Sequence, residues 1–306
     1  MKAINFVSEF AAQKPLKLAF MSDWHADSPD CDLVSLKRDL AICKKEGRHI
    51  ILGGDIFDAI IHTDQKRFTP SRNENNRDDQ INAKLEILFS LTKDYADNII
   101  FIGRGNHEES ILKHTSTDIL DLLIKQLNLI KTNGEIIKGN YQNFMRFDFI
   151  KKSNGKSLAH YDILQHHGAG ASAPVTKGAI DFNRIIHGTN VDLVVLGHKH
   201  HANFLGSDPI MYIDISGEIK IKNRQAIMTP SYAKGRSINY NVNFAERFYT
   251  HQSLSGFASL DLTPTWEDNK ATLKSDIAMR INSVAKIGDL QNVLIKKRLN
   301  DRQNTK

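Results

Sequence analysis

The stretch that decides the fold spans residues 99–108 and reads IIFIGRGNHE. Its first four residues, Ile99–Ile102, form a short apolar run that ends at a turn, which is typical of a buried strand. The next residues deliver an amide, Asn106, and an imidazole, His107, to the end of that strand. Because a Gly-Asn pair alone is usually only a turn, the interpretation depends on whether other segments supply partners.

Four further apolar runs end in polar residues of the same kinds. These are Leu16–Met21 before Asp23 and His25, Ile50–Leu52 before Asp55, Leu158–Gln165 before His166 and His167, and Val191–Leu196 before His198 and His200. In open α/β sheets, ligands bind beyond the carboxyl ends of the strands. Carboxylate, amide and imidazole ligands suit manganese, iron or zinc, and the lack of cysteine among them disfavours a structural zinc site. The pattern therefore predicts a metal site.

The order of the predicted elements indicates the fold class. Apolar residues recur at helical spacing in Leu33–Lys45, Ile81–Tyr95, Ser110–Leu127 and Thr176–Ile186. Later segments favour strands, namely Glu135–Lys151, Met211–Ile221 and Phe257–Leu262. Strands alternating with helices early in the chain, followed by a strand-rich part, predict a layered α/β sandwich.

The composition is that of an ordinary globular protein. Of its 306 residues, 41% are hydrophobic and 25% charged, and the net charge of +6 slightly favours a phosphorylated or polyanionic partner. Two cysteines, Cys31 and Cys43, indicate a reducing compartment and no disulfide framework. The first fifteen residues do not resemble a secretion signal, and no apolar run is long enough to span a bilayer. We therefore expect a cytoplasmic protein without a membrane partner.

Taken in order, five motifs resemble those of the calcineurin-like metallophosphoesterase superfamily. They are Asp23-x-His25, Gly54-Asp55-x-x-Asp58, Gly105-Asn106-His107-Glu108, His167-Gly168 and Gly197-His198-x-His200, within residues 16 to 202. The resemblance implies a four-layer α/β/β/α sandwich of mixed β-sheets flanked by helices, with two divalent metal ions in its cleft. We expect manganese first, with iron or zinc as alternatives.

The resemblance also implies which residues bind each metal. Asp23, His25 and His200 would hold one ion, Asn106, His167 and His198 the other, and Asp55 would bridge them. Neighbouring residues of a strand point to opposite faces, so only one histidine of the pair at 166 and 167 can be a ligand. Relatives often place this ligand directly before a glycine, which favours His167 and leaves His166 as the alternative.

The same resemblance implies the chemistry. Two adjacent cations lower the pKa of a shared water, which yields a hydroxide that attacks the phosphate ester. His107 would protonate the leaving oxygen, and Asp58 would orient its imidazole. Asp58 could instead be a helix-starting cap.

Arg104 offers a further inference. Residues 104–108 are similar to a motif of the phosphoprotein phosphatases, in which this arginine clamps the substrate phosphate, but Ala59 stands where those enzymes carry a second arginine. Arg104 could also be a plain surface residue. Conversely, residues 54–58 are similar to a motif of double-strand-break repair nucleases, although no capping domain like theirs is evident.

The function predicted from these observations is a binuclear-metal-dependent phosphodiesterase or nuclease that acts on nucleotides or nucleic acid. A phosphomonoesterase that uses Arg104 is the alternative, and a silent metal-binding scaffold is a third class. The segments Thr229–Tyr232 and Tyr240–Arg247 resemble a C-terminal portion of phage and prophage members and are expected to border the cleft. The substrate and the oligomeric state stay open.

The domain organisation follows from the same evidence. Residues 1–263 are expected to form the metallophosphoesterase catalytic domain. Residues 264–306 are expected to form a helical extension and a polar tail, because Ile277, Ile281 and later apolar residues recur at roughly helical spacing. The polar segment His62–Asp79 could form a wall or lid of the cleft, or a plain solvated loop.

Overall fold

The computed structural model describes residues 3–62, 79–170, 176, 178–233 and 254–281. Its strands are β1 (Ile4–Glu9), β2 (Leu16–Met21), β3 (His49–Leu52), β4 (Ile99–Ile102), β5 (Ile137–Lys138), β6 (Gln142–Ile150), β7 (Ser157–His166), β8 (Leu193–Leu196), β9 (Asn203–Ile213), β10 (Ile219–Met228), β11 (Gly256–Glu267) and β12 (Lys270–Ile281). Its helices are α1 (Leu33–Glu46), α2 (Gln80–Thr92), α3 (Asn106–Thr115), α4 (Ile119–Ile130), α5 (Ala179–Ile186) and the short 3₁₀ helix η2 (Lys93–Tyr95).

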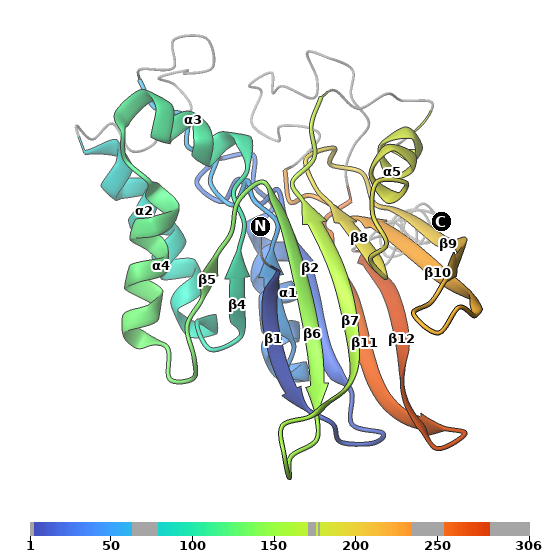
Figure 1. Cartoon of the computed structure of the whole chain (residues 1–306). Coiled ribbons are helices and arrows are strands. Elements are labelled where there is room, and N and C mark those ends of the chain that lie inside the picture. The colour runs from blue at the N-terminus through green and yellow to red at the C-terminus, as the bar shows by residue number, and fades with distance from the viewer. Residues whose placement is uncertain (1–2, 63–78, 171–175, 177, 234–253, 282–306) are drawn as a thin grey trace, which may run out of the picture.

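The strands form two mixed sheets that pack face to face (Figure 1). The first sheet has the order β1-β6-β7-β8-β10-β9, and the second has the order β12-β11-β2-β3-β4-β5. Strands β2, β3, β4 and β5 are parallel, whereas β11 and β12 run antiparallel to their neighbours. In the first sheet, β7, β8 and β10 are parallel to one another.

Alternating side chains explain why the sheets stack in layers. In β2, Phe20 points into the core between the two sheets, whereas its neighbour Met21 points toward the helices. Helices α1 to α4 cover the outer face of the second sheet, and α5 covers the outer face of the first with Phe182 and Ile186. This arrangement confirms the predicted four-layer α/β/β/α sandwich.

The parallel strands bring polar loops to one edge of the sandwich. Strands β2, β3 and β4 end at this edge, as does β8 of the first sheet (Figure 1). The backbone N–H of Asp23 donates to the Gly54 carbonyl, and that of His25 donates to the Asp55 carbonyl. These backbone hydrogen bonds therefore hold the loops after β2 and β3 together without a ligand.

Three predicted elements are wrong in extent. The strand expected over Glu135–Lys151 is two strands, β5 and β6, which belong to different sheets. The helix expected over Ser110–Leu127 is two helices, α3 and α4, because Ser116 adopts a left-handed conformation with φ of 55° and Asp118 caps α4. The strand expected over Met211–Ile221 is the end of a hairpin, β9–β10, whose turn contains Gly217 with φ of 82°. Strand β1, which pairs in parallel with β6, was not predicted.

The C-terminal extension also differs from the prediction. The predicted boundary between residues 263 and 264 falls inside β11, and Ile277 and Ile281 lie in β12 instead of a helix. Residues 282–306, most of the 62–79 segment, and Tyr240–Arg247 lie outside the described residues. No helix in the described part of the chain is long and apolar enough to cross a membrane.

Candidate active site

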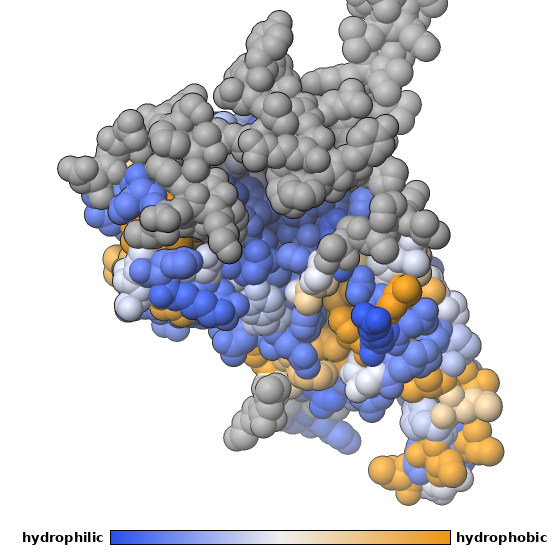
Figure 2. Space-filling view, turned by 90° about the horizontal axis from the view of Figure 1, so that it is seen from above, coloured by the Kyte–Doolittle hydropathy of each residue, from blue (hydrophilic) through white to orange (hydrophobic). Residues whose placement is uncertain are grey.

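Histidine and carboxylate side chains gather where the loops after β2, β3, β4, β7 and β8 meet. Three groups have ligand atoms that all lie within 4.8 Å of one another: Asp23, His25 and His200; Asp55, His167 and His198; and His25, Asp55 and His107. Viewed along the strand ends, the surface between the grey segments is hydrophilic (Figure 2). The structure thus brings together residues that lie up to 177 positions apart in the chain.

The first group lies on the loops after β2 and β8. His200 Nε2 is 3.4 Å from Asp23 Oδ1, and the rings of His25 and His200 are 5.3 Å apart. His25 is buried, and its Nε2 has no hydrogen-bond partner within the described residues. A buried ring nitrogen without a partner is costly unless it binds something, and a metal ion would satisfy it.

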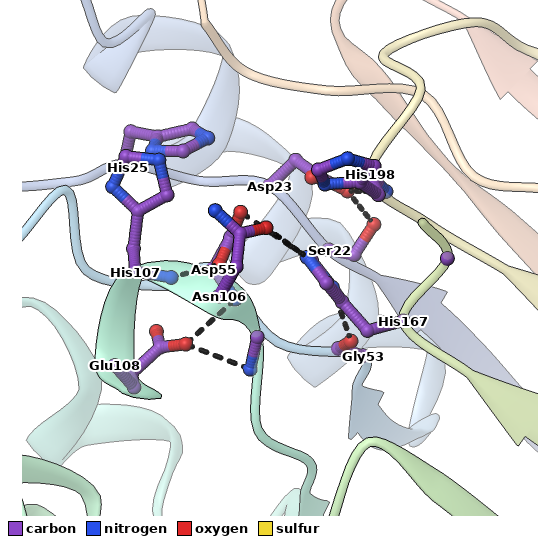
Figure 3. Close-up of polar contacts among 12 residues, drawn as sticks. Ser22, Asp23, His25, Gly53, Asp55, Asn106, His107, Glu108, His167 and His198 are labelled. Carbon is purple, nitrogen blue, oxygen red and sulfur yellow. Dashed lines mark hydrogen bonds and ion pairs between the residues drawn. The ribbon is translucent and has the colours of Figure 1, made fainter. Parts of the chain in front are cut away.

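The second group lies on the loops after β3, β7 and β8, with Asn106 beside it (Figure 3). His167 Nε2 is 3.1 Å from Asp55 Oδ2 and 3.2 Å from Asn106 Oδ1. His167 Nδ1 is 3.0 Å from the Gly53 carbonyl oxygen, which can only accept. The proton of the neutral ring therefore lies on Nδ1, and the Nε2 lone pair faces the group.

His166 does not join the group. Its Nδ1 accepts a hydrogen bond from the backbone N–H of Gly168 at 2.8 Å, whereas His167 is fully buried among the carboxylates. The structure therefore places His167, the histidine favoured from the sequence, with Asp55 and Asn106.

The electrostatics of these groups favour bound cations. Burial alone would raise the pKa of Asp23, but the hydrogen bond and charge of His200 outweigh it and lower the pKa to about 2. Burial opposes protonation of His167, yet the charge and hydrogen bond of Asp55 raise its pKa to about 9. The pKa of His25 also rises to about 9 against its burial, because of Asp58 and Asp55. The buried carboxylates thus stabilise positive charge in the site, and a pair of divalent ions could supply that charge.

Asp58 and His107 contact each other in an unexpected way. His107 Nδ1 lies 2.5 Å from the backbone carbonyl oxygen of Asp58, whereas the carboxylate Oδ1 is 3.6 Å away. That carboxylate lies nearer to His25, with Oδ1 3.3 Å from His25 Nδ1. Asp58 is in a loop and does not begin a helix.

Five predicted ligands have a strained backbone. Positive φ angles between 45° and 69° occur at Asp23, His25, Asp55, His198 and His200. Each such residue costs about 1–3 kcal/mol and persists only where its surroundings enforce it. Strain of this kind concentrates at functional sites, so its presence at five clustered residues supports a functional role.

Two buried carboxylates hold the loop that carries Asp55. Glu108 accepts the backbone N–H groups of Asp55 and Phe57 at 3.0 Å each, and Asp27 accepts those of Asp58 and Ala59. Asp27 is also paired with the buried amine of Lys84 at 2.7 Å. Sequence reasoning missed the roles of Glu108 and Asp27, since neither is needed as a ligand.

The segment Thr229–Tyr232 donates hydrogen bonds to the backbone of Asp23. Ser231 Oγ and the backbone N–H of Tyr232 both donate to the Asp23 carbonyl, at 2.9 and 3.0 Å. The Asp23 carboxylate in turn accepts the backbone N–H of His198 at 3.0 Å. These contacts help to hold Asp23 in its left-handed conformation.

Arg104 is turned to another partner. Its Nη2 lies 2.5 Å from Asp118 Oδ2, and Lys138 Nζ lies 2.6 Å from the same oxygen. Only 14% of the Arg104 side chain is exposed. The guanidinium therefore belongs to an ion-pair cluster at the start of α4, and its predicted role as a phosphate clamp stays a prediction.

The sandwich thus carries, at the ends of its strands, His/Asp groups whose ligand atoms are close enough to hold metal ions. The sequence profile of the calcineurin-like phosphoesterase family matches residues 16–202, more than half of the chain. The chain therefore belongs to the calcineurin-like phosphoesterase family. Hydrolysis of phosphate esters with divalent metals is the general character of that family.

A comparison with solved structures found matches of low sequence identity and low TM-score. One is Vacuolar Protein Sorting 29 from Cryptosporidium parvum, with 10% identity, 87% of this chain and 99% of that chain covered, and a TM-score of 0.37. Another is GAP50, described as the anchor in the inner membrane complex of Plasmodium, with 14% identity, 92% and 94% covered, and a TM-score of 0.40. No curated protein matches the chain significantly.

Proposed function

We propose that the chain is a metal-dependent phosphodiesterase that hydrolyses nucleotides or nucleic acid. One observation carries the proposal. Asp55 has ligand atoms near His167 and His198 on one side and near His25 on the other, as a carboxylate shared between two ions must. Divalent cations bound there would neutralise charge on a phosphate ester and lower the pKa of a nearby water.

We assign the ligands by position. Asp23, His25 and His200 would hold one ion, and Asn106, His167 and His198 the other, with Asp55 common to both. Manganese is our first choice, because carboxylate, amide and imidazole donors suit it, and iron or zinc are the alternatives. The Gly53 carbonyl would keep the His167 ring in the tautomer that presents Nε2 to the ion.

We assign His107 the transfer of a proton to the leaving oxygen. The hydrogen bond from Nδ1 to the Asp58 carbonyl fixes the ring, so Nε2 is the atom that would exchange the proton. Asp58 would thus orient His107 through its backbone, while its carboxylate orients His25.

The surroundings of Arg104 favour a diester over a monoester. A phosphate monoester carries more negative charge, which arginines commonly neutralise. Here the Arg104 guanidinium is paired with Asp118, and residue 59 is alanine where the related phosphatases carry an arginine. A diester carries a single negative charge, so its binding depends less on arginine side chains.

The test compares bis-p-nitrophenyl phosphate with p-nitrophenyl phosphate in the presence of manganese, and then single- and double-stranded DNA. We expect hydrolysis of the diester by the wild type and its loss in His167→Ala. His166→Ala is the matched control, because the neighbouring ring lies outside the cluster, and it should keep most of the activity. Hydrolysis of the monoester alone would refute the diesterase. Bound metal without hydrolysis of any ester would indicate a binding scaffold.

A further inference from the structure

The hairpin β9–β10 carries an aliphatic face that no other described part of the chain covers. Residues opposite each other in antiparallel strands share a face, and Ile213 pairs with Ile219 as Met211 pairs with Ile221. These four side chains are 72–77% exposed, and Ile215 in the turn is fully exposed. We call these five residues the hairpin face.

The hairpin projects from the side of the sandwich. Figure 1 shows β9 and β10 on the side of the sandwich opposite helices α2 to α4, and Figure 2 shows hydrophobic residues at the projecting end. Strand β9 is the edge of the first sheet and pairs only with β10 among the described strands. An isolated two-stranded hairpin is marginally stable in water. Burial of its apolar face against a partner would therefore stabilise this part of the fold.

The size of the hairpin face suits an interface. Burying an aliphatic side chain fully removes roughly 60–120 Å² of apolar surface from water, so five side chains offer about 300–600 Å². This equals the largest apolar patch on a typical monomer, which is often functional. Two such faces together would bury about 600–1,200 Å², a range that includes the ~1,000 Å² at which specific interfaces begin.

The charges of the hairpin argue against a lipid or nucleic-acid partner. Residues 203–228 contain three acidic and three basic side chains, so the net charge is 3 − 3 = 0. Each basic side chain lies against an acidic one: Lys220 with Glu218, Lys222 with Asp192, and Arg224 with Asp208. Anionic membranes and nucleic acids attract unpaired basic clusters, which the hairpin does not offer.

We propose that the hairpin face is the dimer interface between two copies of this chain. A neutral, aliphatic surface can pack against a copy of itself, and a two-fold axis brings the same patch of both copies together. The two hairpins would pack face to face about 10 Å apart, as stacked sheets do. Ile213 and Ile219, the middle pair of the face, would lie nearest to the axis.

Sedimentation velocity of the full chain over roughly 1–100 µM tests the proposal, and we expect a reversible dimer. In the double variant Ile213→Lys, Ile219→Glu, opposite charges preserve the cross-strand pair while the apolar face is lost, so the dissociation constant should rise at least about hundredfold. Leu129→Lys is the matched control, because Leu129 is 86% exposed on α4, and it should dimerise like the wild type.

Cross-linking supplies a second readout that does not depend on that variant. Both native cysteines are buried, so Ile221→Cys adds one accessible thiol, which a short bis-maleimide should link into dimers. A wild type that stays monomeric throughout, or a double variant that dimerises as well as the wild type, would overturn the proposal. So would wild-type binding to phosphatidylcholine vesicles that the double variant loses, which would identify a membrane-docking hairpin instead.

Discussion

Glu108 Oε2 accepts the backbone N–H of Asp55 at 3.0 Å, which joins the start of α3 to the loop that follows β3. The same oxygen accepts the N–H of Gly105 at 2.9 Å, and Oε1 accepts that of Phe57. Burial, and next the charge of Asp55, raise the pKa of Glu108 to about 7. Three backbone N–H donors compensate for the loss of water around this buried carboxyl group.

The first prediction concerns this contact. In Glu108→Gln, one acceptor oxygen becomes an amide donor that faces backbone N–H groups, so at least one buried donor loses its partner. The free energy of unfolding should fall by about 1–3 kcal/mol, and metal content should drop with it. Urea denaturation and metal analysis measure the two effects. Glu109→Gln is the control, since the Glu109 carboxylate pairs with the exposed Lys113 and Gln keeps an oxygen that can accept from Tyr141, so stability should change little. Equal stability of both variants would show that Glu108 does not hold the loop.

Asp55 is the subject of the second prediction. If its carboxylate is shared by two ions, Asp55→Asn should lower the occupancy of both sites, because an amide cannot bridge cations as a carboxylate does. Elemental analysis after dialysis against manganese would report two ions per wild-type chain and fewer than one per variant chain. Asp148→Asn, a change on β6 away from the site, should keep both. Two ions retained in Asp55→Asn would rule out the bridging assignment.

Much of the fold could be read from the sequence because its strands are short apolar runs bounded by turns. β4 was predicted to its last residue, and α1 nearly so. β12 was mistaken for a helix because Ile277 and Ile281 lie four residues apart, a spacing that suits both a helical face and alternate positions of a strand. Antiparallel pairing with β11 makes this segment a strand, and a local sequence pattern does not reveal such a long-range pairing.

The clustering of the candidate ligands was predictable from the sequence, whereas the residues that support them were not. His167 and His198 follow apolar strands, which the sequence displays. The left-handed backbone of Asp55 could not be foreseen, since the type of residue there gives no sign of it. A signal was overlooked at the break between α3 and α4, where Ser116, Thr117 and Asp118 form a polar run typical of a helix start.

Arg104 gives the third prediction. Its guanidinium pairs with Asp118, so Arg104→Gln should leave KM and kcat for the diester within about twofold of the wild type while the free energy of unfolding falls by roughly 1 kcal/mol or less. Steady-state kinetics and urea denaturation test both parts. A large rise in KM with unchanged stability would restore the phosphate-clamp role that the motif suggests.

The fourth prediction concerns Asp118 and the pH dependence of stability. Burial would raise its pKa, but hydrogen bonds from Lys138 and Arg104 outweigh that and lower it. The ion pairs therefore stabilise the fold above the ordinary carboxyl pKa of about 3.9 and lose that effect as pH falls through the lowered value. Asp118→Asn keeps an oxygen to cap α4 yet removes the charge. Its destabilisation in urea should be full at pH 6 and shrink toward pH 3, and a pH-independent difference would refute the electrostatic account.

His107 carries the fifth prediction. It lies beside His25 and Asp55, with ring centroids of His25 and His107 4.6 Å apart, yet its Nδ1 is engaged by the Asp58 carbonyl. If the ring supplies a proton to the leaving oxygen, His107→Ala should keep both metal ions and lose most turnover. The loss should be about 10²–10⁴-fold with an alkyl leaving group and much smaller with p-nitrophenolate, which needs no proton to depart. Equal losses for the two leaving groups would exclude proton donation, and loss of the metals would make His107 structural. His114→Ala, on the last turn of α3, is the matched control and should behave as the wild type because it lies at the opposite end of that helix.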